Sequence, residues 1–153
     1  MPYLIALAAI LIDQYTKALA VLKLQAASAP VIQNVFHFTY VENTGAAFGI
    51  FKNGNSVFTA VISIVLIGIV VALVIIKPPQ RILKISAGLI LGGAAGNLID
   101  RIFRGFVVDF FDFRLINFAV FNVADSCVTV GAVLLCVYLL FLEQKKVADD
   151  EKA

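Results

Sequence analysis

The chain alternates between long apolar stretches and shorter segments in which charged and turn-forming residues gather. Four stretches approach the roughly 20 apolar residues that a helix needs to cross a bilayer: residues 3–22, 57–76, 82–99 and 124–142. The pattern predicts a membrane all-α bundle of four transmembrane helices. We interpret residues 1–153 as a single domain.

The two longer connections, residues 23–56 and 100–123, are not simple linkers. They contain β-branched and aromatic runs bounded by turn residues, which predict strands at residues 35–41, 106–113 and 115–121. Such strands would form a small extracytoplasmic β-sheet at the membrane surface, where aromatic side chains are favoured.

The basic residues predict the orientation. Three fall within residues 77–84, around the start of the third stretch, and two follow the last stretch: Lys77, Arg81, Lys84, Lys145 and Lys146. Positive residues near helix ends favour the cytoplasm, so both termini are expected there. The longer connections then face the opposite side. Three arginines in the 100–123 connection reduce this bias.

Composition supports a membrane protein. The chain is 61% hydrophobic and 14% charged, whereas soluble domains are about 45–50% apolar and about 25% charged. The net charge of +2 is too small to suggest a nucleic-acid partner. With one histidine, and two cysteines about 13 Å apart along a single helix, no disulfide between them and no metal site is expected.

The first apolar stretch has a second interpretation, as a cleaved signal peptide, because small residues follow it at positions 26–29. However, no basic residue precedes it, and Asp13 interrupts it. We therefore interpret it as a membrane helix. Asp13 and Lys17 are four residues apart, so they share a helix face and are expected to pair within the bundle.

Acidic residues within or beside membrane helices are costly and often functional. Asp109 and Asp125 both fall near the outer boundary of the bilayer, where two carboxylates sharing a proton would suit acid–base hydrolysis. Alternatively, Asp125 caps the last helix and Asp109 is a polar residue on an interfacial strand. Asp112 is expected on the opposite face of the strand, in solvent.

Two further groups are candidates for binding. Asn97 and Arg101 share a helix face and reach the outer boundary together. Arg101 either extends to lipid phosphates or binds a ligand. The turn-prone residues 43–49 form either a plain connection or a loop that presents the Asn43 amide to a ligand. His37 has no neighbouring ligand at a metal-binding spacing, so it is expected to be structural or exposed.

These features leave three functions open. The first is a protease at the membrane edge that uses Asp109 and Asp125. The second is a proton-coupled transporter in which Asp13 carries the proton. The third is a non-catalytic subunit that associates through the small residues 92–96.

Five motifs together carry a family resemblance: DQYTK at residues 13–17, NTGAAFG at 43–49, GGAAGNLIDR at 92–101, VVDF at 107–110 and FNVAD at 121–125. In this order, around four apolar stretches, they resemble the lipoprotein signal peptidases (signal peptidase II), which are membrane aspartyl proteases of bacteria. The match covers nearly the whole chain, and no motif position departs from the pattern.

The resemblance implies an enzyme that removes the signal peptide from diacylglyceryl-modified prolipoproteins, cutting just before the lipidated cysteine. It implies no cofactor, sensitivity to globomycin, a location in the bacterial cytoplasmic (inner) membrane with the site near the outer face, and contact with lipid; a monomer is expected. Asp109 and Asp125 match the catalytic aspartates. The residues that match substrate-binding positions are Asn43, Asn97, Arg101 and Asn122. The residues expected to support the site are Asp13, Lys17, Gly45 and Phe48. Phe36 and Phe38 are further candidates for positioning the peptide.

Overall fold

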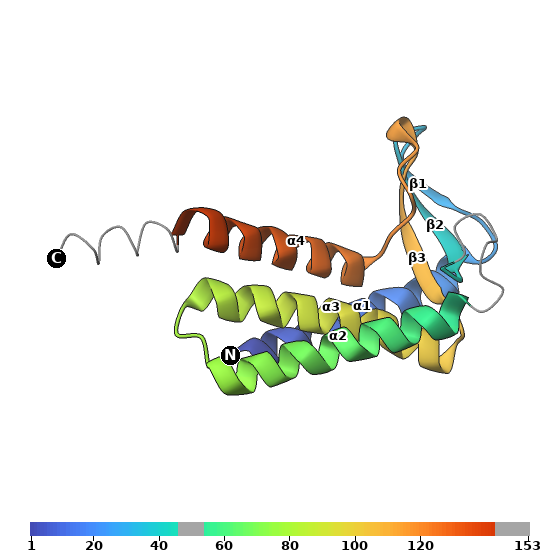
Figure 1. The fold of residues 1–153 in the computed structure, drawn as a ribbon. Coiled ribbons are helices and arrows are strands. Elements are labelled where there is room, and N and C mark those ends of the chain that lie inside the picture. Colours follow the sequence, from blue (N-terminus) through green and yellow to red (C-terminus); the bar gives the residue numbers. More distant parts are fainter. Residues whose placement is uncertain (46–53, 143–153) are drawn as a thin grey trace.

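The computed structural model describes residues 1–45 and 54–142, and it contains four long helices with a small sheet at one end (Figure 1). The helices are α1 (Pro2–Leu24), α2 (Gly54–Ile76), α3 (Arg81–Phe103) and α4 (Val123–Val137), the last continued by a π-helical turn, Tyr138–Leu142. All four are long and apolar enough to cross a membrane, so the predicted spans are confirmed to within a few residues.

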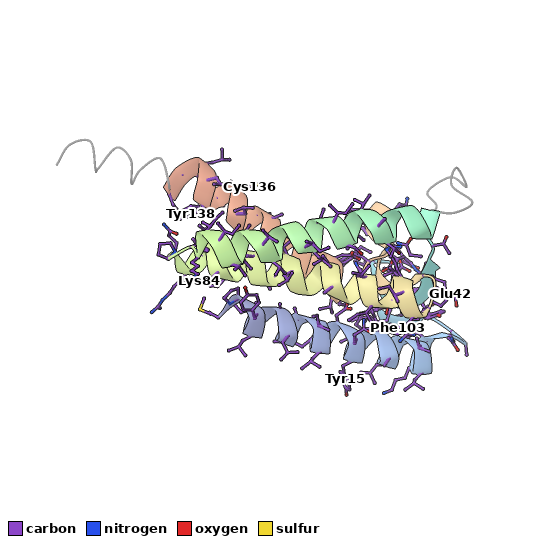
Figure 2. The ribbon with its side chains drawn as sticks, turned by 60° about the horizontal axis from the view of Figure 1, so that its bottom comes forward. Tyr15, Glu42, Lys84, Phe103, Cys136 and Tyr138 are labelled. Carbon is purple, nitrogen blue, oxygen red and sulfur yellow. The ribbon has the colours of Figure 1, made fainter. Side chains whose placement is uncertain are left out.

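The outward faces of the helices are apolar. Leu4, Leu11 and Ile75 leave 72%, 60% and 73% of their surfaces exposed. Figure 2 shows Tyr15 projecting away from the bundle in the same manner. Apolar exposure on this scale is unfavourable in water but suits a surface in contact with hydrocarbon.

Helix α3 is the centre of the bundle, because it packs against α1, α2 and α4. Its glycines allow the close approach. A Cβ added at Gly92 would lie 2.7 Å from the backbone oxygen of Ala6 on α1, and one added at Gly93 would overlap the carbonyl of Ala124 on α4. Close packing of small residues is a main source of helix association in lipid.

Three antiparallel strands, β1 (Ala29–Ile32), β2 (Phe36–Asn43) and β3 (Val107–Phe113), form a sheet in the order β1-β2-β3. The sheet lies at one end of the bundle, and its strands run across the direction of the helices (Figure 1). Strands β2 and β3 were predicted to within two residues, but the short, fully exposed β1 was not.

The strand predicted at residues 115–121 is wrong. The chain forms a 3-10 turn at Arg114–Ile116, and Asn117 then takes a left-handed conformation with φ of 48°. This backbone geometry ends an extended strand. Within this segment, Phe121 forms an isolated bridge to Phe111 on β3. The segment therefore returns the chain from the sheet to α4.

A buried ion cluster joins the helices to the sheet. Lys17, Asp13 and Asp100 are fully buried, and Lys17 Nζ lies 2.9 Å from Asp13 Oδ2 and 3.1 Å from Asp100 Oδ2. The predicted pairing of Asp13 with Lys17 is confirmed. Asp100 of α3, which sequence reasoning did not link to this pair, shares the same ammonium group.

The two carboxylates of this cluster also accept backbone hydrogen bonds. Ala124 N, in the first turn of α4, donates to Asp13 Oδ1 at 2.9 Å. Val108 N, on β3, donates to Asp100 Oδ2 at 3.1 Å. The cluster thereby fixes α1 against α3, α4 and β3.

We expect Gly93→Ala to destabilise the bundle and Gly68→Ala to leave it unchanged or slightly more stable. The added Cβ at Gly93 overlaps the Ala124 carbonyl, whereas no atom lies within 4 Å of one added at Gly68. Overpacking costs about 1–3 kcal/mol, and alanine favours an exposed helix over glycine by about 1 kcal/mol. Thermal unfolding in one detergent measures both variants, and equal midpoints would contradict the described α3–α4 packing.

We expect Lys17→Met to destabilise the protein by about 3–5 kcal/mol, because it leaves two buried carboxylates without their cation. Lys23→Met is the matched control, since Lys23 lies exposed in the last turn of α1. Thermal unfolding of the two variants side by side measures the difference. A Lys17→Met variant as stable as its control would show that the ammonium does not hold the cluster together.

Candidate active site

Asp109 is a buried carboxylate with two amide donors. It lies on β3 with 1% of its surface exposed. Asn43 Nδ2 donates to Asp109 Oδ2 at 2.8 Å, and Asn122 Nδ2 donates to Asp109 Oδ1 at 2.7 Å. The donors come from β2 and from the residue before α4, so three separate segments meet at this side chain.

A β-bulge places Asn43 within reach of Asp109. Phe38 pairs with Phe111 and Val41 pairs with Asp109, so β2 contains one more residue than β3 between these two pairs. Side chains alternate between the faces of a strand, and the extra residue therefore brings Val41 and Asn43 onto the face that carries Asp109. A regular pairing would turn the Asn43 amide away from the carboxylate.

Asp125 lies at the N-terminus of α4, but it is not the N-cap. Asn122 is the cap. Its Oδ1 accepts from Asp125 N at 2.9 Å, and its main-chain N donates to Asp125 Oδ2 at 3.1 Å. This reciprocal arrangement is a capping box, so the alternative that Asp125 itself caps the helix is wrong. Asp125 remains half-buried.

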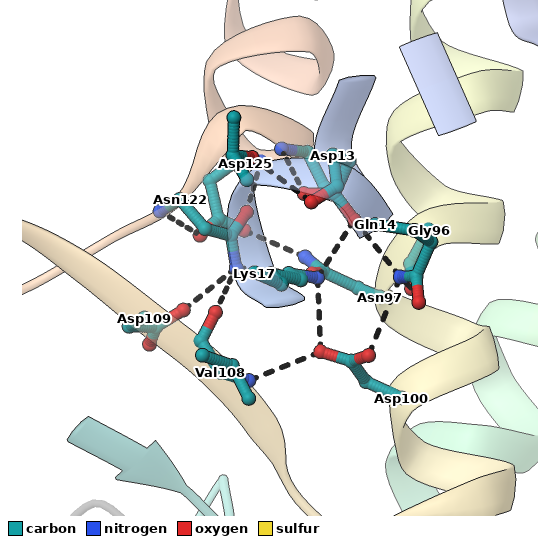
Figure 3. A network of polar contacts seen from close by, with 12 residues as sticks. Asp13, Gln14, Lys17, Gly96, Asn97, Asp100, Val108, Asp109, Asn122 and Asp125 are labelled. Atoms are coloured by element: carbon teal, nitrogen blue, oxygen red, sulfur yellow. Dashed lines mark hydrogen bonds and ion pairs between the residues drawn. The ribbon is translucent and has the colours of Figure 1, made fainter. Parts of the chain in front are cut away.

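Asn122 connects the two carboxylates. Its side chain donates to Asp109 while its main-chain N–H donates to Asp125, so both acids converge on one residue (Figure 3). The structure thus brings together Asp109 and Asp125, which lie on different elements.

Asn97 links this pair to the buried ion cluster. Its Nδ2 donates to Asp125 Oδ1 at 2.8 Å, while its Oδ1 accepts from Lys17 Nζ at 2.8 Å. A cation attracts the amide oxygen, so Lys17 turns the NH₂ group of Asn97 toward Asp125. Figure 3 shows these contacts as one continuous network.

The environment of Asp109 suits a carboxyl group that keeps a proton. Burial raises the pKa of Asp109 from its ordinary value of 3.8 to about 6. The hydrogen bond from Asn43 lowers this pKa, the negative charge of Asp125 raises it, and the hydrogen bond from Asn122 lowers it. Because burial dominates, Asp109 gains a proton near neutral pH more readily than a carboxyl group in water does.

Two cavities open beside Asp125. One of about 400 Å³ lies among α2, α3 and α4 and is lined by Asn97 and Arg101. The other, of about 600 Å³, is lined by Asn43 and residues 118–121. Asn97 and Arg101 therefore share a face, as predicted, and Arg101 lies within electrostatic reach of Asp109 and Asp125.

Three further residues considered in the sequence analysis are Gly45, Phe48 and Asp112. Gly45 has φ of 75° and donates from its backbone N to Asn43 Oδ1 at 2.8 Å, which directs the Asn43 amino group toward Asp109. Phe48 lies outside the described residues. Asp112 faces away from the pair, as predicted, but Thr39 and Arg114 bind it, so it is not simply solvated.

The sequence analysis did not predict that Asp100 and Gln14 belong to the buried ion cluster around Lys17. Gln14 Nε2 contacts Asp13 Oδ2 at 3.2 Å and Asp100 Oδ1 at 3.3 Å. The available signal was an acid one helical turn after Gly96 on a helix rich in small residues.

Among the described residues, no group of three His, Cys, Asp or Glu side chains is placed to hold a metal ion.

Comparisons with known proteins identify the family to which the chain belongs. Residues 5–141 match the family model described as Signal peptidase (SPase) II. The chain is 46% identical over 145 residues to the lipoprotein signal peptidase of Brevibacillus brevis, covering 94% of this chain and 97% of that one. It is also 46% identical over 150 residues to that of Halothermothrix orenii, covering 97% and 100% of the two chains.

A solved structure is similar as well. A bacterial membrane enzyme determined at 1.9 Å resolution superimposes with a TM-score of 0.84 and 33% identity, covering 92% of each chain. The family match at residues 5–141 includes the sheet and nearly all of the four helices. The chain therefore belongs to the signal peptidase II family.

Proposed function

We propose that Asp109 and Asp125 are the catalytic pair of an aspartic endopeptidase that removes signal peptides from prolipoproteins. The enzyme cuts just before the cysteine that carries the diacylglyceryl group. The observation that carries this proposal is the convergence of both carboxylates on Asn122, with cavities opening on both sides of Asp125. Family membership supports the same reaction.

The two acids have different surroundings, which favours different roles. Asp109 is buried, and its pKa is raised to about 6, so we assign it the shared proton. Asp125 lies in the first turn of α4, where backbone N–H groups and the helix dipole favour a negative charge. We therefore assign Asp125 as the general base.

Hydrolysis then proceeds by proton transfer between this pair and the substrate. Asp125 takes a proton from water, whose oxygen attacks the scissile carbonyl carbon, while Asp109 donates its proton to the carbonyl oxygen. The resulting gem-diol collapses as Asp125 returns the proton to the amide nitrogen of the cysteine. The C–N bond breaks, and a hydroxyl proton of the gem-diol restores protonated Asp109.

We assign substrate contacts to the polar groups around this pair. Arg101 and Asn97 line the cavity beside Asp125 and can donate to peptide carbonyl groups. Asn43 and Asn122 hold Asp109, and Asn43 also lines the larger cavity beside Asp125. Gly45 supports Asn43, and the sequence assigns a similar supporting role to Phe48.

We propose that the aromatic residues of the sheet form a platform for the substrate peptide. Phe38 and Phe111 are paired across β2 and β3, with ring centroids 5.9 Å apart, and Phe36 lies beside them. An extended peptide that crosses this platform would be shielded from water on one side.

The positions of the basic loop and of the sheet at opposite ends of the bundle support an orientation of the protein in the membrane. Figure 2 shows Lys84 at the opposite end of the bundle from Phe103 and Glu42, which lie at the sheet end. Because basic loops favour the cytoplasm, the catalytic pair faces outward from the bacterial cytoplasmic (inner) membrane, with both termini inside. Lipid surrounds the apolar helix faces, and the enzyme acts as a monomer.

The transporter alternative is less consistent with the site. A proton carrier must exchange with water, whereas Asp13 is fully buried, binds Lys17 at 2.9 Å and accepts from Ala124 N. Asp13 is therefore a structural member of the ion cluster in this proposal.

We expect Asp109→Asn and Asp125→Asn each to reduce cleavage by about a thousandfold, within the range for loss of one acid–base group. Asp112→Asn is the matched control, because Asp112 lies on the other face of β3 and binds Thr39 and Arg114. Turnover of a purified lipidated precursor peptide measures all three variants. Retained turnover in either of the first two variants would remove that residue from the catalytic pair.

We expect Asn43→Ala to move the alkaline side of the pH–rate profile to higher pH. Asp109 must keep its proton, so the rate falls as the pH rises through the upper apparent pKa of the pair. The Asn43 hydrogen bond lowers the pKa of Asp109, and its loss raises that pKa. The pH dependence of kcat/KM in wild type and variant measures the shift. An unchanged or acid-shifted limb would contradict the role given to Asp109.

A further inference from the structure

The sheet ends in two apolar turns that extend away from the bundle, and we call residues 31–35 and 114–118 the sheet tip (Figure 1). Leu115 N donates to Val35 O at 3.4 Å, which joins the turn after β1 to the 3-10 turn after β3. Five apolar side chains of the sheet tip leave more than half of their surfaces exposed: Val31, Ile32, Leu115, Ile116 and Phe118. Such a patch marks a surface that meets an apolar partner or a membrane.

The sheet tip has little charge to keep it in water. Arg114 is the sole charged residue in segments 31–36 and 113–121 of the sequence. Its Nε donates to Asp112 Oδ2 at 2.8 Å, and its Nη2 donates to Thr39 Oγ1 at 3.2 Å. The guanidinium is therefore held along the sheet and balanced by a carboxylate, so it leaves the apolar side chains of the tip without a free charge beside them.

The position of the sheet tip places these side chains beside lipid. Figure 1 shows the tip extending past α4 and set back from the outer end of α2 along the direction of the helices. About 14 Å of strand separates Asp109 from Phe113, since each of the four steps rises about 3.4 Å. Phe118 of the tip and Val130 of α4 line one cavity, and Val130 belongs to the exposed apolar surface of α4. The tip thus continues a surface that faces hydrocarbon in a membrane.

We propose that the sheet tip inserts into the bilayer leaflet on the sheet side and forms a second membrane anchor beside the helices. Its apolar side chains meet the acyl chains. The side chains of Gln33, Asn34 and Asn117 are also exposed, and they limit the insertion to the boundary of the headgroups. The anchor holds the far ends of β2 and β3 at the membrane surface and so restrains the strand that carries Asp109. The membrane-spanning helices support this anchor independently of the proposed reaction.

A second protein is a poorer occupant of the sheet tip than lipid. A stable protein–protein interface uses about 20–30 residues on each side, whereas the tip consists of two five-residue segments. Insertion into a leaflet needs no such area, because the four helices already hold the tip at the membrane and lipid is present there at high concentration.

The test uses tryptophan fluorescence, because the chain contains no tryptophan. Ile116→Trp reports on the sheet tip, and Leu11→Trp is the lipid-exposed reference on α1. Ala27→Trp is the matched control in the exposed connection between α1 and β1, and it also reveals any preference of the indole itself for the interface. Each full-length variant is placed in vesicles of phosphatidylglycerol and phosphatidylethanolamine. Lipids brominated on their acyl chains quench from the membrane, and acrylamide quenches from water.

We expect brominated lipid to quench Ile116→Trp several-fold more than Ala27→Trp and nearly as much as Leu11→Trp, with acrylamide giving the reverse order. Quenching of Ile116→Trp by acrylamide as strong as that of Ala27→Trp would overturn the proposal. Protection of Ile116→Trp from both quenchers would also overturn it, because a second copy or another part of the protein would then cover the tip.

A second variant tests whether the apolar side chains hold the sheet tip in the membrane. Leu115→Asp is added to Ile116→Trp, since both side chains are exposed and the change disturbs no packed contact. A charge on a lipid-facing surface is unfavourable, so we expect quenching by acrylamide to rise and quenching by brominated lipid to fall. The same quenching with and without Leu115→Asp would contradict the anchor.

Discussion

The buried ammonium of Lys17 is the interaction on which the site depends. Transferring one cation and two carboxylates out of water costs several kcal/mol for each ion, and mutual attraction recovers this cost only in good geometry. The cluster has that geometry, with Nζ at 2.9 Å and 3.1 Å from the two carboxylates. A well-packed apolar cluster would stabilise the bundle about as well, so we attribute the charges to specificity. They allow one register of α1 against α3.

This specificity reaches the two proposed catalytic residues through the backbone. Asp13 binds the N–H group of Ala124, and Asp100 binds that of Val108. These two residues immediately precede Asp125 and Asp109, so each proposed catalytic acid follows a residue whose N–H group the ion cluster holds in place. Asn97 provides a third connection, from Lys17 to the Asp125 carboxylate. The cluster thus positions both acids without touching the substrate.

The sequence predicted what depends on local chemistry. Membrane spans follow from length and hydropathy, and the family motifs contain Asp109, Asp125, Asn43, Asn97, Arg101 and Asn122. Features that depend on long-range pairing were not predictable. The bulge in β2 appears only once β3 is beside it, and the place of Asp100 on a helix rich in small residues does not by itself reveal that it shares Lys17 with Asp13. The aromatic run at residues 115–121 has strand-like composition, but the left-handed Asn117 ends the extension.

The unequal burial of the two acids follows from where the site lies. A hydrolase needs water, yet a lipid-bearing substrate stays in the membrane, so the pair must lie where both are available. Asp109 is backed by the buried side chains of Val107, Val108 and Phe110, which withhold water and favour its neutral form. Asp125 borders two cavities at the start of a helix, where water and a negative charge are both tolerated. A symmetric pair would lack this division, so in the proposed mechanism the sheet over the helix end is what separates the acid from the base.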